Sequence, residues 1–238
     1  MALDLRLDGA VVLVTGGTRG IGAGIACRFR EAGAQVVVCA RAGSGADFVA
    51  CDVREPASVD ALVAEVVRRH GRLDVLVNNA GGAPFADTAT ASPRFHTKVV
   101  ALNLLAPLGV AQAANAVMQR QNQGGVIVNV SSVSAMRPSP RTAAYGAAKA
   151  GLDNLTATLA VEWAPRVRVN ALDVGMVRTE AGRYGDGVAA TVPLGRLATP
   201  AEVGSCAVFL ASPLASYVSG ARLAVHGGGE APAYLRGE

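Results

Sequence analysis

The stretch that decides the fold is AVVLVTGGTRGIGAGIACRFREAG, residues 10–33. Residues 10–15 are apolar and rich in β-branched side chains, a pattern typical of a buried strand. The glycine-rich turn 16–22 follows, and then a helical segment that Gly33 ends. A strand, a glycine turn and a helix in this order predict a loop for the pyrophosphate of a dinucleotide. Glycine lets the backbone approach the phosphates, and the helix N-terminus offers unpaired N–H groups.

The rest of the chain repeats this alternation of apolar strands and helical segments. Residues 41–47 are too few for a crossover helix, so we expect an open loop there. Pro107 predicts a bend or a local break in its helix, and residues 173–193 predict a flexible segment. The expected strands are 35–40, 48–52, 73–78, 126–130, 167–172 and 221–225, and the expected helices are 56–70, 92–123, 142–163 and 200–211.

This alternation predicts an α/β fold with a Rossmann-type, doubly wound parallel sheet of about seven strands and helices on both faces. We find no internal repeat and no linker, so residues 1–238 are expected to form a single domain. Ligands of such sheets bind beyond the carboxyl ends of the strands. Four positions should therefore meet at one rim: Gly16, Asn79, Ser132 and Asp173.

Composition excludes several classes of protein. The chain is 51% hydrophobic and 17% charged, which indicates a well-filled core. The net charge of +4 is scattered, which argues against nucleic-acid binding. We see no signal peptide and no apolar run that approaches a membrane span. The four cysteines lack metal-ligand spacing, so we expect no metal site and reduced thiols in a cytoplasmic protein.

Tyr145 and Lys149 lie four residues apart in a segment of strong helical character, so both side chains share one helical face. A phenol has a pKa near ~10 in water, too high for proton transfer at neutral pH. A neighbouring ammonium favours the phenolate, which is what an acid/base tyrosine needs. A Tyr–Lys pair is by itself a weak signal, because most such pairs are solvated.

The motifs taken together resemble the short-chain dehydrogenase/reductase family along nearly the whole chain. The segments 15–22 and 78–81 resemble its cofactor loop and the motif after its fourth strand. The catalytic set of the family is matched at Asn103, Ser132, Tyr145 and Lys149. Each motif alone is unspecific, whereas the combination is highly specific.

The resemblance implies an NAD(P)-dependent oxidoreductase that reduces a carbonyl to an alcohol or catalyses the reverse. Tyr145 would exchange the proton, and Ser132 would hydrogen-bond the same oxygen. Lys149 would bind the nicotinamide ribose and depress the Tyr145 pKa, and Asn103 would hold a water that links Lys149 to solvent. The candidate small-molecule substrates are 3-oxoacyl thioesters and small ketones, with sugars and steroids left open. Residues 82–85, 133–141 and 176–191 should wall the pocket.

The resemblance also implies the cofactor contacts, with NADP(H) favoured over NAD(H). An NAD-selective site usually ends the second strand with a carboxylate, and Ala40 stands there. Arg41 and Arg19 could flank a 2′-phosphate. The implied contact residues are Gly16, Thr18, Arg19, Gly20, Ile21, Gly22, Arg41, Asp52, Val53, Asn79, Ala80, Gly81, Tyr145, Lys149, Val177 and Thr179.

Two departures from the family pattern stand out. Asp173-Val174-Gly175 replaces the usual Pro-Gly, and this extra carboxylate could reach the substrate pocket. His226 begins a His-Gly-Gly where Asp-Gly-Gly is common, and we interpret it as structural. The family commonly forms homotetramers through two long helices, here 92–122 and 142–163. The apolar stripe of the second helix, which could also be core alone, is Leu152, Leu155, Leu159 and Trp163.

Two other readings remain. A catalytically idle nucleotide-sensing protein would need the glycine loop but has no need of Ser132, Tyr145 and Lys149. A methyltransferase on a related sheet would need an acidic residue at position 40 to hold ribose. The response to reduced nicotinamide cofactor versus S-adenosylmethionine discriminates between the classes.

Overall fold

A computed structural model describes residue 5 and residues 7–180 and 186–229 of the chain. In this part, one parallel sheet runs in the order β3-β2-β1-β4-β5-β6-β7, which confirms the predicted fold class. The strands are β1 (Val11–Thr15), β2 (Gln35–Ala40), β3 (Phe48–Ala50), β4 (Val75–Asn78), β5 (Gly125–Ser132), β6 (Val167–Val174) and β7 (Arg222–Val225). The predicted strand ends differ from these by at most two residues.

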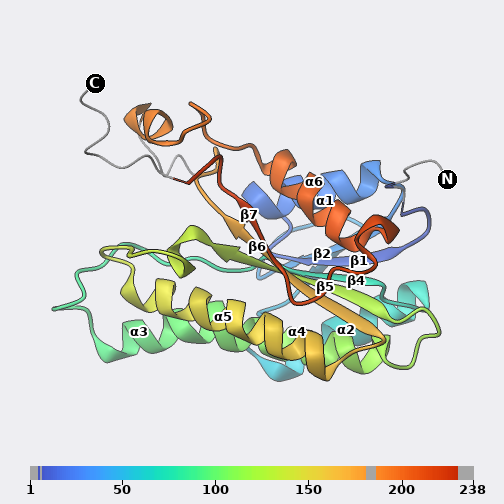
Figure 1. Cartoon of the computed structure of the whole chain (residues 1–238). Coiled ribbons are helices and arrows are strands. Elements are labelled where there is room, and N and C mark those ends of the chain that lie inside the picture. Colours follow the sequence, from blue (N-terminus) through green and yellow to red (C-terminus); the bar gives the residue numbers. More distant parts are fainter. Residues whose placement is uncertain (1–4, 6, 181–185, 230–238) are drawn as a thin grey trace.

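Helices cover both faces of the sheet (Figure 1). α1 and α6 pack on one face, and α2, α4 and α5 pack on the other, so the sheet separates two hydrophobic cores. The helices are α1 (Gly20–Glu31), α2 (Pro56–His70), α3 (Pro93–Val100), α4 (Ala106–Met118), α5 (Ala143–Glu162) and α6 (Pro200–Ala211). Shorter helical turns are η1 (Ala101–Leu105), η2 (Val133–Ala135), η3 (Asp186–Thr191) and η4 (Pro213–Ala215).

α1 and α6 touch backbone to backbone through two glycines. A Cβ on Gly24 would lie 2.4 Å from the Cβ of Pro200, and a Cβ on Gly204 would lie 2.8 Å from the carbonyl oxygen of Gly24. α6 begins with a capping box between Thr199 and Glu202. Its first turn is thus fixed both by its own cap and by α1.

The long helix predicted for residues 92–123 is interrupted. α3 and α4 are joined by η1, a π-helical turn in which the N–H of Ala106 bonds to the carbonyl of Ala101. Pro107 has no N–H to give to the carbonyl of Asn103, four residues back, so an α-helical ladder cannot continue there. Of the two predicted alternatives, the local break is confirmed, and it takes the form of a π turn.

The segment Pro93–Met118 corrects one expectation. Its 26 residues contain an 18-residue window with a mean hydropathy of 1.5 and so meet the length and composition of a membrane span, although no such run was expected. In the structure it is a helix of the core, because Val110, Ala114 and Met118 are buried against the sheet and α2. The apolar stripe of α5 also belongs to this chain's own core: Leu152 and Leu159 are buried, and Leu155 and Trp163 pack partly against the same cluster.

Two predicted loops have different outcomes. Residues 41–47 contain no helix, as predicted. The segment 173–193 is more ordered than predicted, since Asp173 and Val174 belong to β6 and residues 186–191 form η3. Residues 181–185 of the same segment lie outside the described residues.

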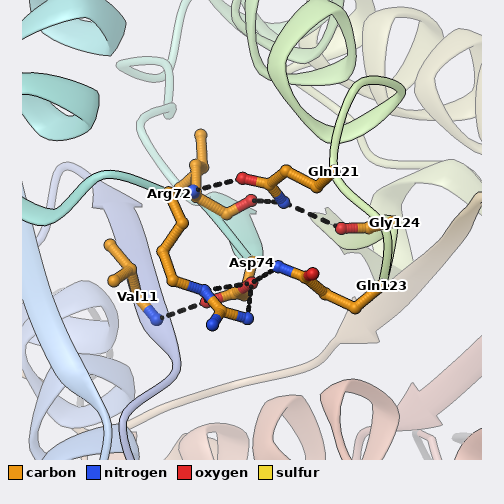
Figure 2. Close-up of polar contacts among 7 residues, drawn as sticks. Val11, Arg72, Asp74, Gln121, Gln123 and Gly124 are labelled. Carbon is orange, nitrogen blue, oxygen red and sulfur yellow. Dashed lines mark hydrogen bonds and ion pairs between the residues drawn. The ribbon is translucent and has the colours of Figure 1, made fainter.

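A polar cluster ties the sheet together at the amino ends of its strands (Figure 2). Asp74 accepts hydrogen bonds from the N–H of Val11 at 2.8 Å, from Arg72 at 2.7–3.0 Å and from Gln123 at 3.1 Å. Gln121 joins both backbone groups of Leu73 to the carbonyl of Gly124. We call Arg72, Asp74, Gln121 and Gln123 the amino-edge cluster. Both carboxylate oxygens of Asp74 are satisfied within it.

Candidate active site

The carboxyl ends of β1 and β4 are clamped together by Thr15 and Asn79. The hydroxyl oxygen of Thr15 accepts from the N–H groups of Asn79 and Ala80, each at 3.0 Å. The side-chain amide of Asn79 donates in return to the carbonyls of Thr15 at 2.9 Å and Gly16 at 3.2 Å. The motif after β4 therefore holds the start of the glycine turn in place through hydrogen bonds to Thr15 and Gly16.

Gly16 and Gly22 have no room for a side chain. Gly16 has φ 63°, and a Cβ there would lie 3.1 Å from the Cα of Ala80. A Cβ on Gly22 would lie 2.3 Å from the carbonyl oxygen of Gly16. α1 begins at Gly20, within the glycine-rich segment, and its N-cap, Arg19, makes no side-chain capping bond. The first-turn N–H groups are thus left for an anion such as a pyrophosphate.

Lys149 is the buried cation of the site. It is 3% exposed, its Nζ donates to the carbonyl of Val130 at 2.7 Å, and it lies 5.7 Å from the ring centroid of Tyr145. Burial lowers the pKa of Lys149 to about 8, and the carboxylate of Asp153 opposes this shift. The predicted juxtaposition of phenol and ammonium on α5 is present in the structure.

Ser132 ends β5 beside the first turn of α5. Its Oγ accepts from the N–H of Ser134 at 3.1 Å, an arrangement that aims the O–H elsewhere. α5 approaches η2 closely because Gly146 has no side chain. A Cβ on Gly146 would lie 2.9 Å from the carbonyl oxygen of Ser134 in η2. The hydroxyl of Ser132 and the ring of Tyr145 are thereby held on neighbouring elements.

Asn103 is buried and its side-chain amide is fully engaged. Its Oδ1 accepts from the N–H of Gly82 at 2.8 Å, and its Nδ2 donates to the carbonyls of Gly82 and Val99 at 3.0 and 2.9 Å. A Cβ on Gly81 would lie 2.8 Å from this Oδ1 and 3.5 Å from the Nζ of Lys149. The structure thus brings Asn103, Gly81 and Lys149 together.

The positions predicted for the adenosine end of the cofactor lie after β2 and β3. Ala40 ends β2, and Arg19 and Arg41 are exposed nearby. Asp52 is paired with Arg54 at 2.9 and 2.5 Å, and these hydrogen bonds lower the pKa of Asp52 to about 2. Its carboxylate is therefore already neutralised by a neighbour.

The other predicted cofactor contacts differ in exposure. Thr18 is exposed, whereas Ile21 and Val53 pack partly against the two cores. Val177 is 4% exposed and its backbone forms a parallel bridge with Ala198. Thr179 lies close to the start of α1, with its methyl carbon 3.7 Å from a Cβ built on Gly20.

A cavity of about 200 Å³ lies next to Ser132 and the end of β6. Val133, Met136, Arg137 and Met176 line it and were predicted as wall residues. The other lining residues were missed: Gly175, Val192, His226 and Gly229. The strand-end rule could have found His226, because it follows β7, the neighbour of β6. The Nδ1 of His226 is buried and has no hydrogen-bond partner among the described residues.

Two predictions about Asp173 are wrong, namely that it lies at the rim and that its carboxylate could reach the substrate pocket. It is 2% exposed within β6 and is not among the residues that line the cavity. It pairs in register with Ser131 and interacts with Asp153 on α5. The carboxylate therefore lies beneath the rim, on the side of α5, and does not reach the substrate pocket.

Comparison with known proteins defines the family. The family model described as enoyl-(acyl carrier protein) reductase matches residues 16–230. The chain belongs to the short-chain dehydrogenase/reductase family, and the expected resemblance is confirmed.

Individual relatives include dehydrogenases named for sugars and sugar alcohols. A D-threitol dehydrogenase of Mycolicibacterium smegmatis is 37% identical over 94% of this chain and 94% of its own. An L-fucose dehydrogenase of Oryctolagus cuniculus is 38% identical over 97% of this chain and 88% of its own. The ligand-free aldohexose dehydrogenase of Thermoplasma acidophilum superposes with a TM-score of 0.87 at 32% identity, covering 94% of each chain.

Proposed function

We propose that the protein is an NAD(P)-dependent oxidoreductase that interconverts a small hydroxylated substrate and its carbonyl form. The observation that carries this proposal is the buried Lys149 beside Tyr145 at the rim, opposite a glycine turn with an uncapped helix. A nucleotide sensor would need the turn but not a buried ammonium held 5.7 Å from a phenol ring.

The residues of the rim fit a dinucleotide. At Gly16 and Gly22 a Cβ would press on the backbone of Ala80 and of Gly16, so glycine keeps this turn tight, and the first-turn N–H groups of α1 suit the pyrophosphate. Lys149 uses one N–H for Val130, which leaves two for ribose hydroxyls. When bound, the nicotinamide would supply or accept the hydride. Tyr145 would exchange a proton with the substrate oxygen, and the O–H of Ser132 would donate to that oxygen.

The cavity supports a small substrate. Its volume of about 200 Å³ is below the roughly 300–1,000 Å³ of pockets for drug-sized ligands. Arg137 and the unpartnered Nδ1 of His226 place polar groups among apolar walls. Substrates of several hydroxyl groups, such as those named for the relatives, would engage these groups better than would a plain ketone or a 3-oxoacyl thioester.

A substrate panel followed through nicotinamide absorbance tests the proposal. We expect turnover of small polyols or aldoses with at least one nicotinamide cofactor. Turnover confined to acyl thioesters would contradict the substrate class. Absence of turnover, together with undiminished cofactor binding, would favour the idle sensor.

We propose that NADP(H) is preferred over NAD(H). Ala40 stands where a carboxylate would repel a 2′-phosphate, and the exposed Arg19 and Arg41 carry guanidinium groups that could bind one. We expect kcat/KM to favour NADPH by at least about tenfold, or about 1.4 kcal/mol, and Ala40→Asp/Arg41→Ala to reverse this preference. A wild-type preference for NADH would refute the proposal.

We also propose a cytoplasmic homotetramer. The stripe of α5 no longer supports this assembly, but Leu105 is 56% and Val161 is 80% exposed on the two helices expected to form the interface. Cys27, Cys39, Cys51 and Cys206 are free thiols, in keeping with a reducing compartment. Light scattering at micromolar concentration measures the mass, and a monomer would contradict the tetramer.

A further inference from the structure

His226 stands where the ends of β6 and β7 meet the cavity. It follows Val225, the last residue of β7, whose carbonyl accepts from the N–H of Gly175 at 3.0 Å. A Cβ on Gly175 would lie 2.7 Å from the Cβ of His226, so the two strand ends can come this close only because Gly175 has no side chain. Gly175 and His226 both line the cavity. The imidazole is therefore built into the cavity wall.

The three glycines after His226 fold the chain back over its ring. Gly227, Gly228 and Gly229 have φ of 67°, 96° and 86°, values in the left-handed region that glycine favours. A Cβ on Gly229 would lie 3.9 Å from the Cε1 and 4.0 Å from the Nδ1 of the imidazole. The carbonyl of Gly227 accepts from the N–H of Leu194 at 3.1 Å, which fastens this turn to the segment after η3. The ring of His226 is thus held on more than one side.

The two nitrogens of this ring are in different surroundings. Nδ1 is buried and has no hydrogen-bond partner in the described part of the chain. A neutral imidazole carries one N–H and one lone pair, and a buried N–H without an acceptor is the rarer of the two orphans. The lone pair therefore belongs on Nδ1 and the proton on Nε2. Since the ring lines the cavity while Nδ1 is shut off, Nε2–H is the group that can donate into the cavity.

The cavity has few other polar side chains. Among the described residues that line it, the other one is Arg137, and one guanidinium N–H of Arg137 is used by the carbonyl of Pro138 at 2.9 Å. The rest of the lining is apolar or glycine, and no carboxylate from the described residues belongs to it. A substrate held in the cavity must therefore offer an acceptor oxygen to His226, or its Nε2–H stays unpaired.

The size of the cavity limits where this oxygen can be. A volume of about 200 Å³ has room for roughly seven groups of the size of a water molecule. In a substrate of that size each oxygen lies within a few bonds of the reacting carbon. The donor of His226 therefore meets an oxygen close to the carbon that would exchange the hydride.

We propose that His226 is a specificity-determining residue, whose Nε2–H donates to a second oxygen of the substrate near the reacting carbon. This inference rests on the proposed dehydrogenase function and narrows its substrates to alcohols that carry a further hydroxyl group. An alcohol without that hydroxyl leaves the donor unpaired, and a site built to hydrogen-bond a hydroxyl rejects the analogue that lacks it. The imidazole takes no part in proton or hydride exchange.

The test compares kcat/KM of the full chain for threitol and for 2-butanol, which share a carbon chain and a secondary alcohol. We expect wild type to favour threitol by at least about tenfold, the size of one net hydrogen bond. His226→Leu should lower this preference by about tenfold, through a lower kcat/KM for threitol, while kcat/KM for 2-butanol stays within about threefold of wild type.

Two further variants identify the nitrogen that donates. The side-chain amide of Gln reaches the place of Nε2, whereas that of Asn reaches only the place of Nδ1. His226→Gln should keep the preference within about threefold of wild type, and His226→Asn should lose it as His226→Leu does. His70→Leu is the matched control and should leave the preference unmoved, because His70 bonds to Gln35 at the amino end of β2.

The ratio of the two alcohols separates specificity from stability. A ratio that is the same in wild type and His226→Leu would overturn the proposal, as would rescue by Asn and not by Gln. A purely structural His226 would lower kcat/KM for both alcohols alike, which also overturns it. Should His226→Leu fail to fold, His226→Gln and His226→Asn carry the same comparison. A wild-type protein that oxidises no polyol or aldose would instead overturn the proposed function.

Discussion

Buried aspartates occur both at the amino ends and near the carboxyl ends of the strands, and their hydrogen bonding differs. At the amino edge, Asp74 receives donors on both oxygens from backbone and side chains (Figure 2). On the side of the rim, the Oδ1 atoms of Asp153 and Asp173 have no hydrogen-bond donor in the part of the chain that the structure describes. The Nδ1 of His226, near the same rim, is also unpartnered among the described residues.

The difference separates two uses of buried polar groups. A satisfied cluster fixes strand positions and has no capacity left for a ligand or a proton. An unsatisfied group costs stability unless something else fills it, and such groups gather where a site needs a proton or a substrate. We therefore expect changes at the amino edge to alter stability alone and changes near the rim to alter activity.

The largest effect should come from Tyr145→Phe at the rim. It removes the transferable proton, so we expect kcat to fall by at least ~100-fold while the free energy of unfolding and the affinity for the cofactor stay nearly constant. Steady-state kinetics, cofactor titration and urea denaturation measure the three quantities. Tyr217→Phe is the control, because Tyr217 is fully exposed. A variant that keeps more than about a tenth of the wild-type rate would contradict the role of Tyr145.

Asp74→Asn should give the converse result. Its amide replaces one acceptor by a donor that faces Arg72 and Gln123, so we expect a loss of about 1–3 kcal/mol in the free energy of unfolding. The kcat of the folded fraction should not change, because the amino edge is remote from the rim. Denaturation midpoints with matched kinetics check this, with Asp60→Asn as the surface control. Unchanged stability would show that the amino-edge cluster is not needed to hold the strands.

The smallest effect concerns the pH dependence of stability. A carboxyl whose pKa is raised on folding, as for Asp173, adds stability that is present below its unfolded pKa of 3.8 and lost as pH rises through about 6. The stability of wild type relative to Asp173→Asn should therefore fall by roughly 1–3 kcal/mol between pH 4 and 7. Urea denaturation at several pH values measures the difference. A constant difference would mean that Asp173 titrates normally in the folded protein.

Local pattern was enough to predict much of the fold. The bounds of α2, the absence of a helix in residues 41–47 and the placing of Tyr145 on one face with Lys149 all follow from spacing and turn residues. These features depend on neighbours a few residues apart, where helical and strand periods act directly.

The remaining features depend on contacts between distant segments. β6 is buried on both faces, so its apolar pattern could not say whether Asp173 points toward the cavity or toward α5. The π turn at η1 arises because Pro107 withholds one N–H, a detail that the helical pattern around it conceals. His226 reaches the cavity because β7 lies beside β6 in the sheet order.

The two glycines that join α1 to α6 have a consequence for how this protein could be diversified. A side chain on Gly24 or Gly204 would clash with the facing helix, so α1 and α6 resist substitution at these two positions. The segment between β6 and α6 carries Met176 and Val192 of the cavity wall. Its two ends are held by β6 and α6, which pack through residues outside the segment. New substrate preferences could thus be selected by varying the cavity-lining positions of this segment while its expected cofactor contacts, Val177 and Thr179, and the half that holds the dinucleotide are left intact.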